Sequence, residues 1–178
     1  RTARALVEEA QRRIAGFSRP AGTEGSGACY VIREPLPGEF WVACKNGLLH
    51  RAGGQWRLYG TKDGLKEAWV AGLATGHDGD VWFSYHGAVG ITRLRRDGGR
   101  PRLEHFNRDS GLAAKLVYAL FFDASGHLWS ATDRGVDVYD GNHWRHYDRE
   151  DGLVWDDCDT ESWFADADGG VWIGTSVG

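Results

Sequence analysis

The sequence of 178 residues contains no methionine, only four prolines and only three cysteines. No stretch approaches the roughly 18 consecutive apolar residues that a membrane-spanning helix needs, which excludes such a helix. Lys plus Arg number 21 against 25 Asp plus Glu, so the chain lacks the positive charge of a typical nucleic-acid-binding domain. Because there is no Met and the chain starts with Arg1, we expect a fragment or a processed product of a longer protein.

The cysteines predict neither a disulfide framework nor a zinc site. Cys29, Cys44 and Cys158 are odd in number, scattered, and form no Cys-x-x-Cys pair. We therefore interpret them as buried or incidental thiols. Hydrophobic residues make up 42% and aromatic residues 12% of the chain, which excludes intrinsic disorder and predicts a sizeable core.

What the sequence has in excess is glycine, with 26 residues, and tryptophan, with nine. Four of the tryptophans recur in one context, an aliphatic or aromatic residue before and small residues after, at intervals of 41, 47 and 43 positions: Trp41, Trp82, Trp129 and Trp172. A glycine stands six residues after each tryptophan, or eight residues after it in the second copy, which carries an insertion. A third landmark, Asp-Gly-Leu or Asp-Ser-Gly-Leu, recurs with the same period at Asp63, Asp109 and Asp151.

The copy from Leu116 to Leu153 shows what one repeat contains. It holds an apolar run, Val117–Phe122, and then three short segments, Leu128–Ala131, Val136–Tyr139 and Trp144–Tyr147, separated by Asp- and Gly-containing turns. This pattern is typical of four strands joined by hairpins. A sheet of this size has two faces to bury and no helix to cover them, so neighbouring copies must cover them.

We therefore predict an all-β fold, a β-propeller of about four Trp-anchored, four-stranded blades that is part of a larger propeller. Residues 1–26 are assigned to the end of a preceding blade, with a strand at 13–17, and a connection. The repeats are assigned to 27–65, 66–112, 113–153 and, as a partial unit, 154–178. A four-bladed ring closed by residues 1–17 is a less favoured alternative. Helical repeats are not predicted, because the repeated units lack the 3.6-residue apolar periodicity that helices of that kind require.

Taken together, the landmarks resemble the two-component-regulator propeller repeat. Gly170–Thr175 and Asp140–Trp144 are very near its consensus. The second unit departs from it, because it lacks the Asp-Gly-x-x-Trp hairpin and carries a basic insert at Arg93–Arg102. The resemblance covers about residues 27–178.

The resemblance implies a propeller, usually seven-bladed, on the periplasmic or extracellular side of a membrane-anchored receptor. In that family the cytoplasmic output is a histidine kinase or a diguanylate cyclase. We accordingly expect a ligand-sensing region without enzyme activity, which takes a small molecule or a glycan, needs no cofactor, and belongs to a homodimeric parent. Two rivals stay open: a metal-dependent propeller lyase resembling virginiamycin B lyase, suggested by Gly79–Phe83, and a protein-binding scaffold.

The repeated residues are expected to build the scaffold. Each tryptophan should fill the space between adjacent sheets, and each Asp before Gly-Leu should bond to its own turn. Asp166–Gly169 resembles a calcium loop only in its alternating carboxylates, and His143 and His146 would point to opposite faces of a strand. We predict no metal site and no catalytic residue.

Residues that do not repeat are the better candidates for function, because the scaffold does not require them. The loops that lead from Asp-Gly-Leu into the next unit differ in sequence and, in propellers, gather near one mouth of the channel. We predict channel-mouth, ligand-binding roles for the residues Trp69, Lys115, Trp155, Asp157 and Asp159.

Overall fold

The computed structural model describes residues 21–95, 101–114 and 116–178. Its strands are β1 (Cys29–Leu36), β2 (Glu39–Cys44), β3 (Gly47–Ala52), β4 (Gln55–Tyr59), β5 (Val70–Thr75), β6 (Val81–Tyr85), β7 (Ile91–Arg95), β8 (Arg102–Phe106), β9 (Val117–Phe122), β10 (Leu128–Thr132), β11 (Gly135–Tyr139), β12 (Trp144–Tyr147), β13 (Cys158–Ala165) and β14 (Val171–Thr175). Three short 3-10 helices are η1 (Thr61–Asp63), η2 (Arg108–Ser110) and η3 (Arg149–Asp151). None of the helices in these residues has the length and apolar character that crossing a membrane requires.

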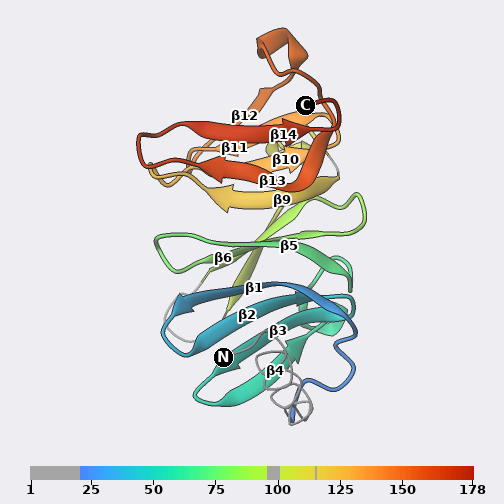
Figure 1. Ribbon diagram of the computed structural model, residues 1–178. Helices are drawn as coiled ribbons and strands as arrows, with labels where there is room; N and C mark the ends of the chain where they lie inside the picture. Colours follow the sequence, from blue (N-terminus) through green and yellow to red (C-terminus); the bar gives the residue numbers. More distant parts are fainter. Residues whose placement is uncertain (1–20, 96–100, 115) are drawn as a thin grey trace, which may run out of the picture.

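The strands form separate antiparallel sheets in which each strand pairs with its neighbour in sequence. The first three sheets have four strands each, β1–β4, β5–β8 and β9–β12, and the fourth has the two strands β13 and β14. The sheets stack side by side, with β5 packed between β1 and β9, and with β9 packed against β13 (Figure 1). This arrangement confirms the predicted all-β propeller.

The strand positions expected from the third repeat are confirmed to within a residue, as β9, β10, β11 and β12 show. In the second repeat, β7 and β8 flank the basic insert and pair from Ile91↔Phe106 to Arg95↔Arg102. The strand expected at 13–17 lies outside the described residues.

The repeated tryptophans pack between sheets in the first three blades. Trp41 and Trp82 are each only 2% exposed, and Trp129 is partly buried against the fourth sheet. The expectation is wrong for Trp172, which is 67% exposed. The physical reason is that no strand of the described residues covers its face of the fourth sheet.

The Asp-Gly-Leu landmarks form the turns between blades. Each contains a 3-10 helix that ends at a glycine with a positive φ, such as Gly64 at 104°. Asp63 and Asp151 each accept a hydrogen bond from a backbone N–H three residues earlier, as expected. In the second copy, Ser110 takes this role in place of Asp109. These turns bring the chain from the last strand of one sheet to the first strand of the next.

Carboxylates also close the turns that precede the tryptophans. Asp123 accepts hydrogen bonds from two backbone N–H groups, and from Trp129 Nε1 at 2.8 Å. Asp166 accepts from Gly170 N at 2.6 Å and from Trp172 Nε1 at 3.3 Å. The acidic loop at 166–169 is therefore organised around its own backbone.

Candidate functional site

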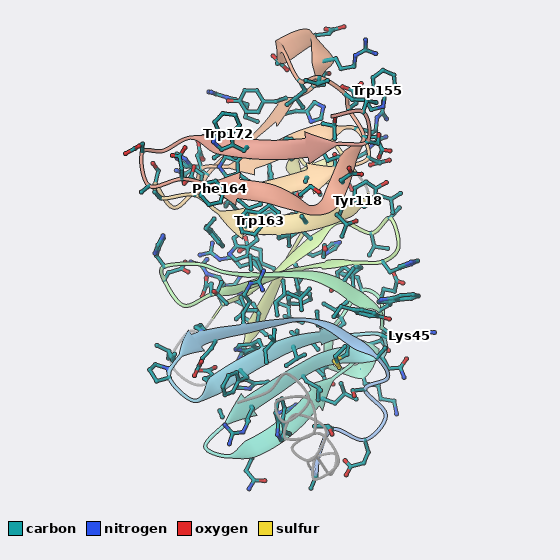
Figure 2. The ribbon with its side chains drawn as sticks, viewed as in Figure 1. Lys45, Tyr118, Trp155, Trp163, Phe164 and Trp172 are labelled. Atoms are coloured by element: carbon teal, nitrogen blue, oxygen red, sulfur yellow. A yellow bond between two sulfur atoms is a disulfide. The ribbon has the colours of Figure 1, made fainter. Side chains whose placement is uncertain are left out.

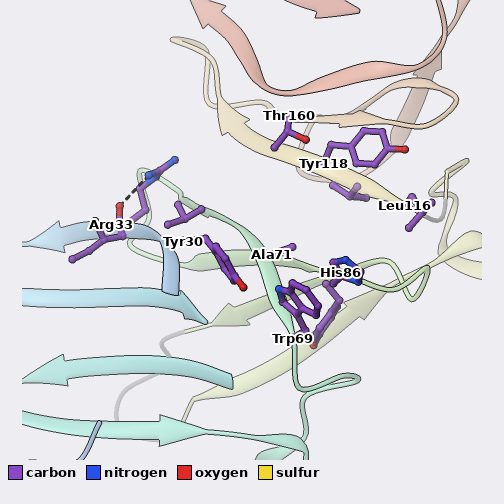
Figure 3. Close-up of a pocket in the computed structure, with 12 residues that line it drawn as sticks. Tyr30, Arg33, Trp69, Ala71, His86, Leu116, Tyr118 and Thr160 are labelled. Carbon is purple, nitrogen blue, oxygen red and sulfur yellow. Dashed lines mark hydrogen bonds between the residues drawn. The ribbon is translucent and has the colours of Figure 1, made fainter. Parts of the chain in front are cut away.

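A cavity of about 840 Å³ opens along the inner strands of all four sheets. Twelve residues line it: Tyr30, Val31, Ile32, Arg33, Trp69, Ala71, Tyr85, His86, Leu116, Val117, Tyr118 and Thr160 (Figure 3). They come from β1, from β5 and the residue before it, from the end of β6 and the residue after it, from β9 and the residue before it, and from β13. In a propeller these first strands face the central channel, so the cavity lies on the channel wall. Its volume suits a ligand of drug size.

The aromatic side of the cavity is centred on Trp69, directly before β5. The imidazole of His86 stacks on the indole, with ring centroids 3.8 Å apart and planes 14° apart. Tyr30 of β1 lies nearly parallel to the same indole, with centroids 6.1 Å apart and planes at 19° (Figure 3). Lys45 Nζ lies 5.2 Å from the indole centroid, a cation–π distance.

Two backbone contacts fix the loop that carries Trp69. His86 N donates to the carbonyl oxygen of Trp69 at 2.9 Å. Gly87 N donates to Glu67 Oε2, also at 2.9 Å. A Cβ at position 87 would meet that carboxylate oxygen, so a larger residue there would displace the Glu67 side chain. The insertion of the second repeat thus holds the loop in place.

A disulfide joins Cys29 to Cys44, which corrects the interpretation of these two residues as incidental thiols. The hairpin of β1 and β2 pairs the two residues directly across the ladder, although they are 15 positions apart in sequence. Only Cys158 is a buried free thiol, as expected. The residues after the two cysteines, Tyr30 and Lys45, both lie beside Trp69.

The opposite side of the cavity is formed by β9 and β13. Burial raises the pKa of Tyr118, and the negative charges of Asp157 and Asp133 add to this effect, so its hydroxyl stays protonated at neutral pH. Arg33 lies on the β1 side of the cavity, two aspartates lie behind the β9 side, and Glu67 lies near Tyr85 at the Trp69 loop.

The five residues that the sequence predicted for the ligand site lie in different environments in the structure. Trp69 lies in the cavity wall. Asp157 neighbours Tyr118, and its carbonyl accepts from Ser176 N at 2.9 Å. Trp155 (labelled in Figure 2) packs under the guanidinium of Arg149, whose Cζ lies 4.6 Å from the centroid of the Trp155 ring. Asp159 is exposed on β13, and Lys115 lies outside the described residues. Of the four described residues, only Trp69 lines the cavity.

Sequence reasoning missed the partners of Trp69. Tyr30 lies on β1, and His86 follows β6. The insertion after Trp82 was the available signal for His86, because an insertion in a repeat adds residues that the scaffold does not need. Nothing in the sequence indicated that Tyr30 would meet Trp69.

The arrangement is suited to binding. It offers flat aromatic surfaces, apolar side chains from three strands, and two cations. Among residues 21–95, 101–114 and 116–178, no three His, Cys, Asp or Glu side chains lie together in a way that could hold a metal ion.

No family model matches the chain, and no curated protein matches it either. Solved structures do. The extracellular domain of a protein described as the hybrid two-component system BT3049 of B. thetaiotaomicron matches with a TM-score of 0.70 at 19% identity, over 82% of this chain and 20% of that one. The extracellular domain of BT4673, from the same organism, gives 0.66 at 19% identity, over 89% and 22%.

Virginiamycin B lyase of Staphylococcus aureus matches with a TM-score of 0.61 at 21% identity, over 85% of this chain and 50% of the lyase. At these identities the likeness shows the propeller fold. The chain spans about a fifth of the length of the two receptor domains and half that of the lyase.

Proposed function

We propose that the chain is a segment of an extracytoplasmic, ligand-sensing β-propeller of a bacterial two-component or cyclic-di-GMP receptor, without enzyme activity of its own. The observation that carries the proposal is the cavity on the channel wall, where the non-repeating residues Trp69, His86 and Tyr30 meet. The repeats would be units 27–65, 66–112, 113–153 and 154–178 of a larger propeller, with 1–26 ending a preceding blade. The parent would be a membrane-anchored homodimer.

Two further observations support the location and the sensing role. The disulfide between Cys29 and Cys44 is typical of proteins that fold in the periplasm or outside the cell. The fold is also that of the extracellular domains of the two receptor proteins. Ligand binding between blades would change how the paired propellers pack and thereby regulate a kinase or cyclase domain.

The proposal is tested by ligand screening on the purified chain. A library of small molecules and glycan fragments is scanned by thermal shift, and each hit is measured by calorimetry with the wild type and with Ala variants of Trp69, Lys115, Trp155, Asp157 and Asp159. Trp172→Ala, on a face away from the cavity, is the control. We expect Trp69→Ala to weaken binding most. If every variant bound like the wild type, these site assignments would be wrong.

The gene gives an independent test of the receptor context. We expect the open reading frame on both sides of this segment to encode more Trp-anchored repeats, a membrane span, and a kinase or cyclase domain. A frame that encoded neither an anchor nor an output domain would overturn the receptor proposal.

A propeller lyase is the second candidate, favoured by the match to virginiamycin B lyase. It predicts chelator-sensitive turnover of a cyclic depsipeptide substrate. A protein-binding scaffold is the third, favoured by the exposed Phe164 and Trp172. It predicts recovery of a stable protein partner without a thermal shift from any small molecule.

A further inference from the structure

We propose that the Trp69 cavity selects a flat aromatic carboxylate. This inference rests on the proposed function, because it names the class of ligand for the same cavity. It depends on the composition of the cavity wall, on the orientation of the rings, and on the position of two cations.

The wall has few of the groups that a sugar needs. None of its twelve lining residues is Asp, Glu, Asn or Gln, in a chain that contains 25 Asp plus Glu. A glycan presents many hydroxyls, and each one that is buried without a partner costs free energy. The wall instead presents Val31, Ala71, Leu116 and Val117, which match an apolar ring.

The aromatic side chains are held in nearly parallel planes. His86 occupies one face of the Trp69 indole at 3.8 Å, which fixes the plane of the ring. Tyr30 lies at 19° to the indole and is 53% exposed, so it offers ring surface to a ligand. Offset stacking of a third ring on such a surface adds to the free energy gained from the area that the ring buries.

Two cations flank these rings. Lys45 Nζ lies 5.2 Å from the centroid of the Trp69 indole, although Lys45 is not one of the lining residues. Arg33 lines the cavity on β1 (Figure 3). Arg33 Nη1 donates to the carbonyl oxygen of Ile32 at 2.9 Å, which leaves its other N–H groups for a ligand. Within the described part of the chain, neither cation forms an ion pair with a carboxylate. A carboxylate on the ligand would pair with Arg33, which lines the cavity.

The acidic groups near the cavity are Glu67, whose carboxylate accepts from Gly87 N beside His86, and two aspartates behind β9. Asp133 and Asp157 act on Tyr118, on the β9 side of the cavity. They disfavour an anion there, so the carboxylate of the ligand faces Arg33 on β1 while its ring stacks beside Tyr30.

Matched probes test the inference by calorimetry on the full chain. The probes are 2-naphthoate, its neutral analogue 2-naphthamide, and glucuronate as an acidic sugar. We expect naphthoate to bind about 3- to 5-fold more tightly than naphthamide, because one exposed ion pair contributes roughly that factor. Arg33→Gln should remove the difference, and Trp69→Leu should weaken both naphthalene probes. Lys62→Gln, on η1 outside the cavity, is the matched control and should bind like the wild type.

The outcomes separate this inference from the proposed function. Equal binding of naphthoate and naphthamide, no binding of naphthoate, or tighter Trp69-dependent binding of glucuronate would overturn the aromatic-carboxylate class. In the last case the cavity would still be a ligand site and the proposed function would stand. If no probe and no library compound bound in a Trp69-dependent way, both the aromatic-carboxylate inference and the proposed ligand-sensing function would fail.

Discussion

At the scale of single residues, one residue type does different work in different blades. Trp82 is enclosed between the second and third sheets, where it contacts Phe106, Phe122 and Tyr139. Trp172 occupies the same position in its repeat but lies open to solvent. The energetic role of a repeated residue therefore depends on whether a neighbouring sheet covers it.

We expect Trp82→Ala to lower the free energy of unfolding by about 3–5 kcal/mol, since it leaves a large cavity in a packed core. Trp172→Ala should cost less than about 1 kcal/mol, because the ring is mostly solvated already. Urea denaturation followed by circular dichroism measures both. Similar losses for the two variants would show that Trp172 is buried in solution.

Asp123 should make stability depend on acid pH. Burial acts to raise its pKa, but hydrogen bonds from Trp129 and His127 outweigh burial and leave the pKa below the ordinary value of an aspartate. A carboxyl group with a lowered folded-state pKa stabilises the fold fully above its unfolded-state pKa, and this stabilisation is lost as the pH falls through the folded-state value. Asp63 and Asp166 shift in the same direction through backbone hydrogen bonds from Gly60 and Gly170.

We therefore expect the free energy of unfolding to decrease as the pH is lowered below about 4. Asp123→Asn should cost about 1–3 kcal/mol at pH 7 and less at pH 3, where the wild-type carboxyl is itself being protonated. Asp109→Asn, at an exposed carboxylate, is the control and should change little. An equal loss for Asp123→Asn at both pH values would contradict the argument.

At the scale of elements, the first hairpin joins stability to the candidate site. The disulfide fixes β1 to β2, and the residues that follow its two cysteines both lie beside Trp69. A buried carboxylate fixes the loop that leads from the second sheet to the third. The carboxylate of Asp137, fully buried in β11, accepts hydrogen bonds from Ala113 N and Ala114 N, and pairs with His146 Nδ1 at 2.9 Å.

Reduction of the disulfide should lower the free energy of unfolding by about 3 kcal/mol, the chain-entropy value for a loop of about 15 residues. Cys29→Ser with Cys44→Ser should reproduce this loss and should also weaken any ligand that stacks on Trp69. Urea denaturation with and without reductant, together with calorimetry, measures the two effects. The double variant should not respond to reductant, and a wild type insensitive to reductant would argue against the bond.

At the scale of the whole molecule, each blade presents one face to the next. Phe121 of β9 pairs with Trp129 across the third sheet and stacks on Trp163 of the fourth sheet, with centroids 4.1 Å apart. Phe164 and Trp172 form the equivalent pair in the fourth sheet, where they are 62% and 67% exposed (Figure 2). This face is the inter-blade surface without a covering strand among the described residues.

Such an apolar patch should bind an apolar dye. We expect the chain to enhance the fluorescence of anilinonaphthalene sulfonate while its near-ultraviolet circular dichroism stays that of a packed protein. Phe164→Ser with Trp172→Ser should remove most of that enhancement. The same double change at Phe40 and Trp56, on the first sheet, serves as a comparison, and dye binding unaffected by the Phe164 and Trp172 changes would place the patch elsewhere.

The sequence by itself determined the repeat, the strands and the turns, because each follows from contacts between residues close in the chain. A turn with a glycine of positive φ, an Asp that bonds to its own backbone, and an apolar strand all leave local patterns. Those patterns recur with the period of one blade, so the propeller could be predicted from them.

Only the tertiary structure decided which residues meet across that scaffold. The pairing of Cys29 with Cys44 depends on the register of a hairpin. The meeting of Tyr30, Trp69 and His86 depends on how two sheets pack, and the exposure of Trp172 depends on what covers its sheet. Such contacts join positions far apart in the chain, and no local pattern of residues records them.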